Sequence, residues 1–161
     1  LMFYGLGTQV MQLSIPFAVG IGGCVGALLR FYISSAVHRA VGDELAFVGT
    51  LAVNLIGCFL IGVLVVVTER THHLSPHAQR VLVTGLLGSL TTFSAFALHS
   101  VNLLQHGRVG AAIVNVAMNV VIGVALTWLG MLAAGTVISE PAGHDSEFPL
   151  SSSETVPEPE A

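Results

Sequence analysis

Residues 85–100 (GLLGSLTTFSAFALHS) form an uncharged stretch that combines glycines, hydroxyl groups and phenylalanines. Gly85 and Gly88 allow the backbone to leave the helical conformation, and nearby hydroxyls can bond the peptide groups that such a break releases. These hydroxyls belong to Ser89, Thr91, Thr92 and Ser94. In a membrane, non-helical backbone is tolerated only where protein or a water-filled cavity satisfies it. The stretch therefore predicts either a polar break beside a permeation path or close helix packing through small residues.

Phe93 and Phe96 lie within this stretch and, three residues apart, share one face of a helix. An aromatic ring has a negative face and a positive edge. Ring edges turned toward a path would offer a weak positive potential without net charge, which suits a small anion that must leave again. The alternative is that both rings contact lipid or the protein core.

Two other segments carry neutral polar residues at helical spacing. Thr50 and Asn54 are four residues apart, and a later segment repeats small or polar residues at steps of four: Asn115, Asn119, Gly123 and Thr127. An asparagine inside a membrane must be hydrogen-bonded, so it faces other helices. Its NH₂ group can donate to an anion, and its carbonyl can accept from a donor. The pattern fits a pore lining and a clamp between helices equally well.

No Asp or Glu lies within the long apolar stretches of the chain. A proton-coupled exporter needs a membrane carboxylate to carry its protons, and this chain has no obvious residue for that role. The sequence has no phosphate-binding G-x-x-x-x-G-K-[ST] motif, and its histidines match no zinc pattern well. Neutral donors favour transport of an anion, and neither an enzyme nor a nucleic-acid-binding protein is expected. Arg30 alone places charge near a span, where it either draws anions toward a vestibule or extends to the membrane surface.

The chain that positions these residues has 161 residues, of which 53% are hydrophobic and 9% charged, with a mean hydropathy of +0.85. Four stretches are free of Asp, Glu, Lys and Arg: 1–29, 45–68, 81–107 and 109–139. Because about 20 apolar residues span the hydrocarbon core as a helix, each stretch holds one crossing. Continuous apolar runs favour helices over the alternating strands of a barrel. The sequence predicts an all-α membrane protein with four transmembrane helices, the third broken at mid-membrane.

The chain divides into three parts. Residues 1–12 are an N-terminal segment of uncertain status, and residues 13–138 form the four-helix transmembrane domain. Its first helix is expected at about 13–37, where small residues recur every fourth position as in a packing face: Ala18, Gly22 and Gly26. Residues 139–161 are rich in Ser, Pro and Glu with little to bury, which predicts a disordered acidic tail.

Arginine is spread almost evenly over the two sides of the membrane, and the chain has no lysine. Four crossings place Arg70 and Arg80 on one side of the membrane and Arg39 and Arg108 on the other. Arg30 belongs to this second side and lies about one or two turns inside the first helix. Orientation normally follows an excess of Lys and Arg on the cytoplasmic side. Either five charges are too few to decide, or the chain inserts both ways and pairs as an antiparallel dual-topology dimer. Such a dimer would double a short polar break into a complete site.

Three segments together resemble the CrcB/Fluc family of fluoride channels: GCVGALLRF (23–31), GTLAVNLIGCFLIG (49–62) and GLLGSLTTFSAF (85–96). The resemblance runs from about residue 16 to residue 135. It implies a multi-pass protein of the cell (inner) membrane that conducts fluoride passively and lowers cytoplasmic fluoride. It also implies an antiparallel homodimer with two pores, embedded in membrane lipid.

By the same resemblance, Asn54 lines the fluoride path, and Phe93 and Phe96 contact fluoride through their ring edges. Thr92 and Ser94 supply hydroxyls to this path.

The resemblance further implies a structural sodium ion that is not transported, bound at the dimer centre by the backbone carbonyls of Gly88 and Thr91. The fourth helix departs from the family, which often has Tyr and Ser where this chain has Asn115 and Asn119. These two asparagines can still donate hydrogen bonds, so they are assigned to the fluoride path.

Other functions remain compatible with the sequence. One is a small dual-topology exporter of another solute, although this chain lacks the membrane carboxylate that such an exporter needs. Another is one subunit of a heterodimeric fluoride channel, paired with a paralogue. A third is a structural subunit without transport activity. This role would explain the glycines, but not the neutral polar residues that recur in three of the predicted helices.

Overall fold

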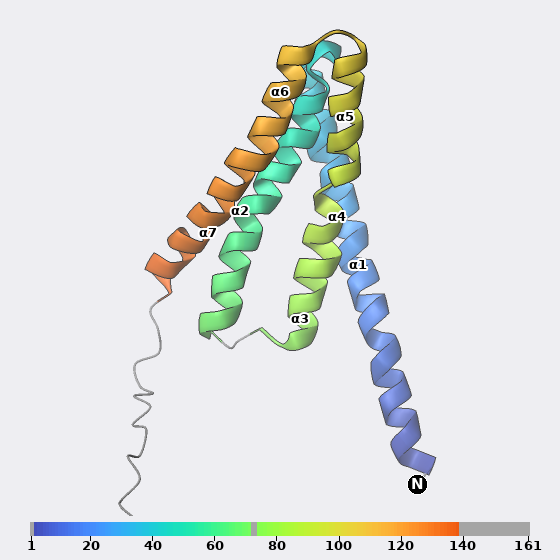
Figure 1. Cartoon of the computed structure of the whole chain (residues 1–161). Coiled ribbons are helices and arrows are strands. Elements are labelled where there is room, and N and C mark those ends of the chain that lie inside the picture. The colour runs from blue at the N-terminus through green and yellow to red at the C-terminus, as the bar shows by residue number, and fades with distance from the viewer. Residues whose placement is uncertain (1, 72–73, 139–161) are drawn as a thin grey trace, which may run out of the picture.

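The computed structural model describes residues 2–71 and 74–138, with side chains from residue 15 onward. All of the elements described are helical (Figure 1): α1 (Met2–Val41), η1 (Asp43–Leu45), α2 (Phe47–Thr71), α3 (Pro76–Arg80), η2 (Val81–Leu87), α4 (Gly88–Leu90), α5 (Phe93–Gln105), α6 (Val109–Ala117), η3 (Met118–Ile122) and α7 (Gly123–Val137). The segments η2 and η3 are π-helical turns that continue the helices on either side of them.

Four helical segments of the described chain are long and apolar enough to cross a membrane: Ile15–Val41, Phe47–Thr71, Pro76–Gln105 and Val109–Val137. They confirm the prediction of a multi-pass, all-α protein with four spans. The third span is interrupted at Thr91 and Thr92, near its middle, as the sequence predicts. Helix α1 begins at Met2, well before the predicted start of the first helix. The predicted tail, 139–161, lies outside the described residues.

The four spans are close together at one end and diverge toward the other (Figure 1). At the closed end α5 and α6 are joined by a short loop beside the start of α2. Helix α2 packs mainly on α7, while α1 packs mainly on η2 and also contacts α2 and α4. The two pairs thereby leave a space between α2 and the interrupted third span.

Glycines set the distance between the packed helices. A Cβ atom on Gly26 would lie 2.1 Å from the Leu86 carbonyl oxygen and 2.3 Å from Ser89 Oγ. A Cβ atom on Gly62 would lie 2.1 Å from the Thr127 carbonyl oxygen. At such distances any side chain displaces a neighbouring helix, so the glycines fix how closely α1 approaches the third span and how closely α2 approaches α7. Gly26 belongs to the small-residue face that the sequence predicts.

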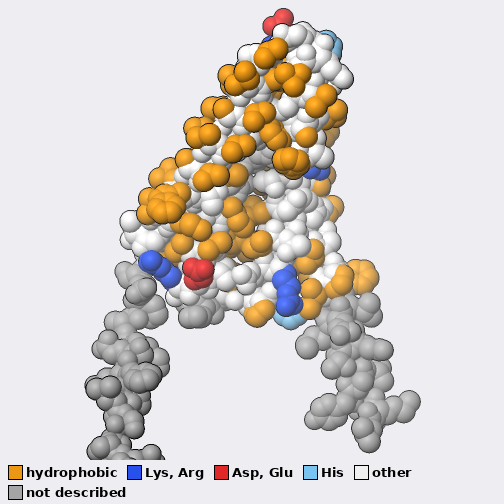
Figure 2. Space-filling model, viewed as in Figure 1, with side chains coloured by type: hydrophobic (Ala, Val, Ile, Leu, Met, Phe, Trp, Pro, Cys, Tyr) orange, Lys and Arg blue, Asp and Glu red, His pale blue; other side chains and the backbone are white. Residues whose placement is uncertain are grey.

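The buried core is small. Val53 of α2 and Leu90 of α4 are 0% and 2% exposed and pack together with Leu87. Figure 2 shows hydrophobic side chains along most of the length of the molecule on the face in view. Large apolar side chains such as Phe17 (73% exposed) and Trp128 (66% exposed) point outward. An apolar exterior over a small core is the arrangement expected of helices surrounded by lipid.

We expect Gly26→Ala to destabilise the protein because the added methyl group meets the Leu86 carbonyl. Overpacking of this kind typically costs about 1–3 kcal/mol of unfolding free energy. Gly20→Ala is the matched control, since no atom lies within 4 Å of its added Cβ. Thermal unfolding of both variants in detergent micelles measures the difference. Equal midpoints for the two variants would contradict the close approach of α1 to the third span.

Candidate functional site

The break in the third span is built from two threonines in extended conformation. Thr91 has φ −82° and ψ 153°, and Thr92 has φ −150° and ψ 112°. Thr92 Oγ1 accepts a hydrogen bond from Ala95 N (3.3 Å) and caps the start of α5, while Thr91 Oγ1 donates to the Leu87 carbonyl (3.0 Å). The Thr92 hydroxyl thus replaces the helical acceptor that Ala95 N loses at the break. The Leu87 carbonyl keeps its helical donor, Thr91 N (3.1 Å), and the Thr91 hydroxyl adds a second bond to it.

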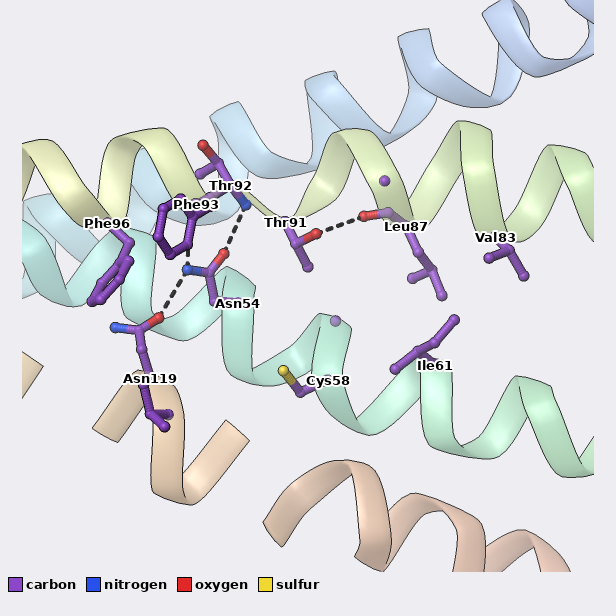
Figure 3. Close-up of a pocket in the computed structure, with 13 residues that line it drawn as sticks. Asn54, Cys58, Ile61, Val83, Leu87, Thr91, Thr92, Phe93, Phe96 and Asn119 are labelled. Carbon is purple, nitrogen blue, oxygen red and sulfur yellow. Dashed lines mark hydrogen bonds between the residues drawn. The ribbon is translucent and has the colours of Figure 1, made fainter. Parts of the chain in front are cut away.

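Asn54 of α2 holds this break from across the space between the helices (Figure 3). Its Oδ1 accepts from Thr92 N (2.8 Å), and its Nδ2 donates to the Thr92 carbonyl (3.3 Å) and to Asn119 Oδ1 (2.9 Å). A backbone N–H can only donate, so the atom facing Thr92 N must be the side-chain oxygen. The Thr92 backbone therefore fixes the orientation of the Asn54 amide, and with it both of the donors on Nδ2.

The same network continues through the fourth span. Asn119 Nδ2 donates to the carbonyl oxygen (2.9 Å) and to Oδ1 (3.1 Å) of Asn115. Asn115, which is 1% exposed, donates from Nδ2 to Ser100 Oγ (2.9 Å), and Ser100 in turn donates to the Phe96 carbonyl (2.9 Å). We call the four side chains of Asn54, Asn119, Asn115 and Ser100 the amide chain. Each of its members orients the next, starting from the Thr92 backbone.

The break also removes the helical partners of two carbonyl groups. In a continuous helix Thr92 N would donate to the Gly88 carbonyl, and Ala95 N would donate to the Thr91 carbonyl. Here Thr92 N donates to Asn54 and Ala95 N donates to Thr92 Oγ1. The Gly88 and Thr91 carbonyls thus lose these helical partners within one turn of each other. They are hard oxygen ligands of the kind that a small cation prefers.

The two phenylalanines lie at the start of α5. Their ring centroids are 5.4 Å apart with the planes inclined by 57°, and both rings are on the side of α5 that faces Asn54 and Asn119 (Figure 3). Phe93 is 79% exposed, which is high for an aromatic residue beside a polar network.

A cavity of about 420 Å³ lies between the third span and the α2–η3 pair. Its lining combines residues of the break with one side of α2: Asn54, Gly57, Cys58, Ile61, Val83, Leu87, Gly88, Thr91, Thr92, Phe93, Phe96, Asn119 and Val120. Among these described residues none is charged. The cavity offers amide, hydroxyl and carbonyl groups between apolar walls, which is a surface for an uncharged contact with an ion or a small solute.

The structure brings together seven of the residues singled out by sequence: Asn54, Gly88, Thr91, Thr92, Phe93, Phe96 and Asn119 all line the cavity. Asn115 is buried behind Asn119 and reaches the cavity only through the amide chain. Ser94 is exposed, outside the lining, and its hydroxyl lies 3.2 Å from Thr92 Oγ1. Arg30 does not line the cavity either.

Ser100 is a site residue that sequence reasoning missed. It is 9% exposed and ends the amide chain. Its spacing could have revealed it, since Ser100 follows Phe96 by four residues and Phe93 by seven and so shares their helix face.

Four apolar spans, an interrupted third span and a neutral polar cavity define the class of small multi-pass membrane proteins. The family model described as CrcB-like protein, Camphor Resistance (CrcB), matches residues 17–131, and the chain belongs to this CrcB family. The resemblance noted in the sequence is thereby confirmed.

The chain is similar over most of its length to proteins named fluoride-specific ion channel FluC. The protein of this name from Sulfurovum sp. (strain NBC37-1) is 46% identical over 122 residues, covering 76% of this chain and 94% of that protein. Another from Geotalea daltonii is 42% identical over 116 residues, covering 72% of this chain and 93% of that protein. These relatives are named as ion channels and not as enzymes, in agreement with the sequence prediction.

We expect Ser100→Ala to weaken folding, because it leaves the buried Nδ2 of Asn115 without its acceptor. An unsatisfied buried polar group costs about 1–3 kcal/mol. Ser94→Ala is the matched control: this exposed serine should change stability by no more than about 0.5 kcal/mol. Thermal unfolding in detergent compares the two. A Ser100→Ala protein as stable as the Ser94→Ala protein would show that the amide chain does not end at Ser100.

Proposed function

We propose that this protein is a passive, fluoride-selective ion channel that lowers cytoplasmic fluoride, and that it works as an antiparallel, dual-topology homodimer with two pores in the cell (inner) membrane. The observation that carries the proposal is the amide chain beside the phenylalanine rings, within a cavity whose described lining is uncharged. The names of the relatives support fluoride as the ion.

Neutral donors match the chemistry of fluoride. Fluoride is small, strongly hydrated and a strong hydrogen-bond acceptor, so its dehydration requires several donors at short range. A lysine or arginine in the path would hold the ion too tightly, because conduction requires binding weak enough to permit release. The hydroxyls at the break and the positive ring edges of Phe93 and Phe96 provide weak attraction of this kind. Loss of an anion along the membrane potential requires no further source of energy.

The amide donors are already used within the single chain. Both hydrogens of Asn54 Nδ2 and both of Asn119 Nδ2 have protein acceptors. An ion entering the path must therefore exchange with one of these contacts, and the longest of them, from Asn54 Nδ2 to the Thr92 carbonyl (3.3 Å), is the first we expect to open. Donors held by mutual hydrogen bonds replace lost hydration without a large reorganisation.

A dimer would explain why the cavity at the break is walled on one side only. The rings and the amide chain form one wall, and Phe93 remains 79% exposed beside the cavity. A second copy with opposite orientation would supply the missing wall, and the two-fold relation would give two equivalent pores. The near-equal distribution of arginine between the two sides supports insertion in both orientations. A paralogue could take the place of the second copy, which would give a heterodimer.

The sodium ion of the proposal fits the carbonyl groups at the break. Gly88 and Thr91 lie within one turn, and their carbonyl oxygens lack the helical donors named above. On a two-fold axis, two copies would contribute four such oxygens, a donor set suited to a hard monovalent cation. The ion would hold the two breaks together and would not move.

We expect proteoliposomes loaded with potassium fluoride to release fluoride rapidly once valinomycin carries potassium, while chloride-loaded vesicles release little. Phe93→Leu should lower fluoride release by about tenfold, corresponding to about 1.4 kcal/mol, because it removes a positive ring edge. Phe17→Leu on the outer face of α1 is the matched control and should match the unmodified protein. Absence of fluoride release from a folded dimer would refute the homodimeric channel.

We expect sodium to raise the thermal stability of the dimer, with potassium at equal concentration as the control. Stabilisation by a ligand of the folded state grows with its concentration and reaches about 2.7 kcal/mol at one hundred times its dissociation constant. Unfolding midpoints measured over a sodium titration test this directly. Superimposable sodium and potassium curves would remove the sodium ion from the proposal without affecting the fluoride path.

A further inference from the structure

A second, chemically different cavity lies near the closed end of the molecule. It has a volume of about 330 Å³ and is lined by the last turns of α1, the residue before α2 and one side of α5: Ser34, Ser35, His38, Arg39, Ala46 and His99. Unlike the cavity at the break, it gathers two hydroxyls, two imidazoles and a guanidinium. All five groups can donate hydrogen bonds, and the guanidinium carries a permanent positive charge.

Most of these donors are free. Within the described part of the chain, the side chains of Ser34, Ser35, Arg39 and His99 make no hydrogen bond or ion pair. His38 is the exception, because its Nε2 lies 3.0 Å from Asp43 Oδ1 at the edge of the cavity. Unpaired donors around one cavity, with no carboxylate among its described lining residues, select a ligand with several anionic acceptor oxygens.

Arg39 carries the only permanent charge among the described residues that line the cavity. Asp43 is 98% exposed and its carboxylate contacts His38 Nε2, whereas no ion pair joins it to Arg39 among the described residues. Glu44, the other nearby acid, lines a neighbouring cavity, where the Arg108 guanidinium donates to its backbone carbonyl (2.5 Å). Arg39 therefore makes no ion pair with either acid, and it lines the cavity together with the two serine hydroxyls.

The position of the cavity indicates the source of the anion. Arg39 lies two residues before the end of the apolar span Ile15–Val41, at the level where lipid headgroups meet the hydrocarbon core. On the same helix face, Leu28 and Tyr32 precede Ser35 and Arg39 at helical spacing and are 51% and 64% exposed. A molecule with its phosphate beside Arg39 could therefore lay its acyl chains along Leu28 and Tyr32.

We propose that this cavity binds the phosphate of an anionic membrane phospholipid. Arg39 supplies the charge, the hydroxyls of Ser34 and Ser35 donate to the phosphate oxygens, and His99 closes the far side. The exposed face of α1 below the cavity accommodates the acyl chains. The site is separate from the amide chain, so it does not depend on the identity of the transported ion.

Lipid retention tests the proposal. The full chain is reconstituted with phosphatidylglycerol and phosphatidylcholine in equal amounts, extracted in a mild detergent, and the retained lipids are counted by native mass spectrometry. We expect the unmodified protein to retain phosphatidylglycerol preferentially. Arg39→Gln should reduce this retention by about tenfold, the effect of losing one charge-assisted contact, and Ser35→Ala by a smaller factor.

Arg80→Gln is the matched control, because Arg80 is an exposed arginine on α3 that lines no part of this cavity. It should retain phosphatidylglycerol as the unmodified protein does. Gel filtration and thermal unfolding of every variant establish that it is folded, and Ser35→Ala replaces Arg39→Gln if that variant does not fold.

Two results would overturn the proposal. One is equal retention of phosphatidylglycerol by the Arg39→Gln and Arg80→Gln proteins. The other is a rise in unfolding temperature with inorganic phosphate, dependent on Arg39, while no lipid is retained, which would identify a free phosphate as the ligand. Fluoride release by the unmodified protein is measured separately, so failure of the lipid site and failure of the channel proposal can be told apart.

Discussion

The hydrogen bond from Thr92 N to Asn54 Oδ1 is the contact on which the rest of the site depends. Through it, the Thr92 N–H bonds Asn54 and not a carbonyl of its own helix. It also fixes which end of the Asn54 amide faces the break. From that orientation follow the contact of Nδ2 with Asn119, the direction of the Asn119 amide toward Asn115, and the donation from Asn115 to Ser100. One side chain on α2 therefore determines the polarity of a network across three spans.

This contact lies where α2 approaches the break closely, since a Cβ atom on Gly57 would lie 2.2 Å from Thr91 Cγ2. Gly26 lets α1 contact the third span through its backbone, and Gly62 does the same for α2 and α7. The interrupted span is thus supported by α1 from outside while Asn54 reaches it from the inner side (Figures 1 and 3). In a membrane the solvent is as apolar as the side chains, so close backbone packing and interhelical hydrogen bonds must supply much of the stability.

The two cavities show a division of chemistry along one molecule. Near the break, donors are neutral and already satisfied by one another, which suits weak and reversible contact with an ion. Near the end of α1, donors are charged or unpaired and surround Arg39, which suits lasting contact with a bound anion. The difference follows from depth, since a permanent charge is costly within the hydrocarbon core and inexpensive at its edge.

The sequence alone determined the four spans, because apolar runs of sufficient length have few alternatives in a membrane. It also placed the break, since Gly88 and the Thr91–Thr92 pair interrupt an otherwise uniform run, and it singled out Asn54 and Asn119 because a lipid-buried amide needs a partner. Only the tertiary structure decided which partner each amide takes: Asn54 could serve a pore or a clamp by spacing alone, and it proved to bond the break itself. Ser100 emerged for the same reason, since its partner Asn115 lies 15 residues away in the chain. The cavity beside Arg39 likewise needs His99 from another span. Helix packing brings these residues together, and local spacing does not encode it.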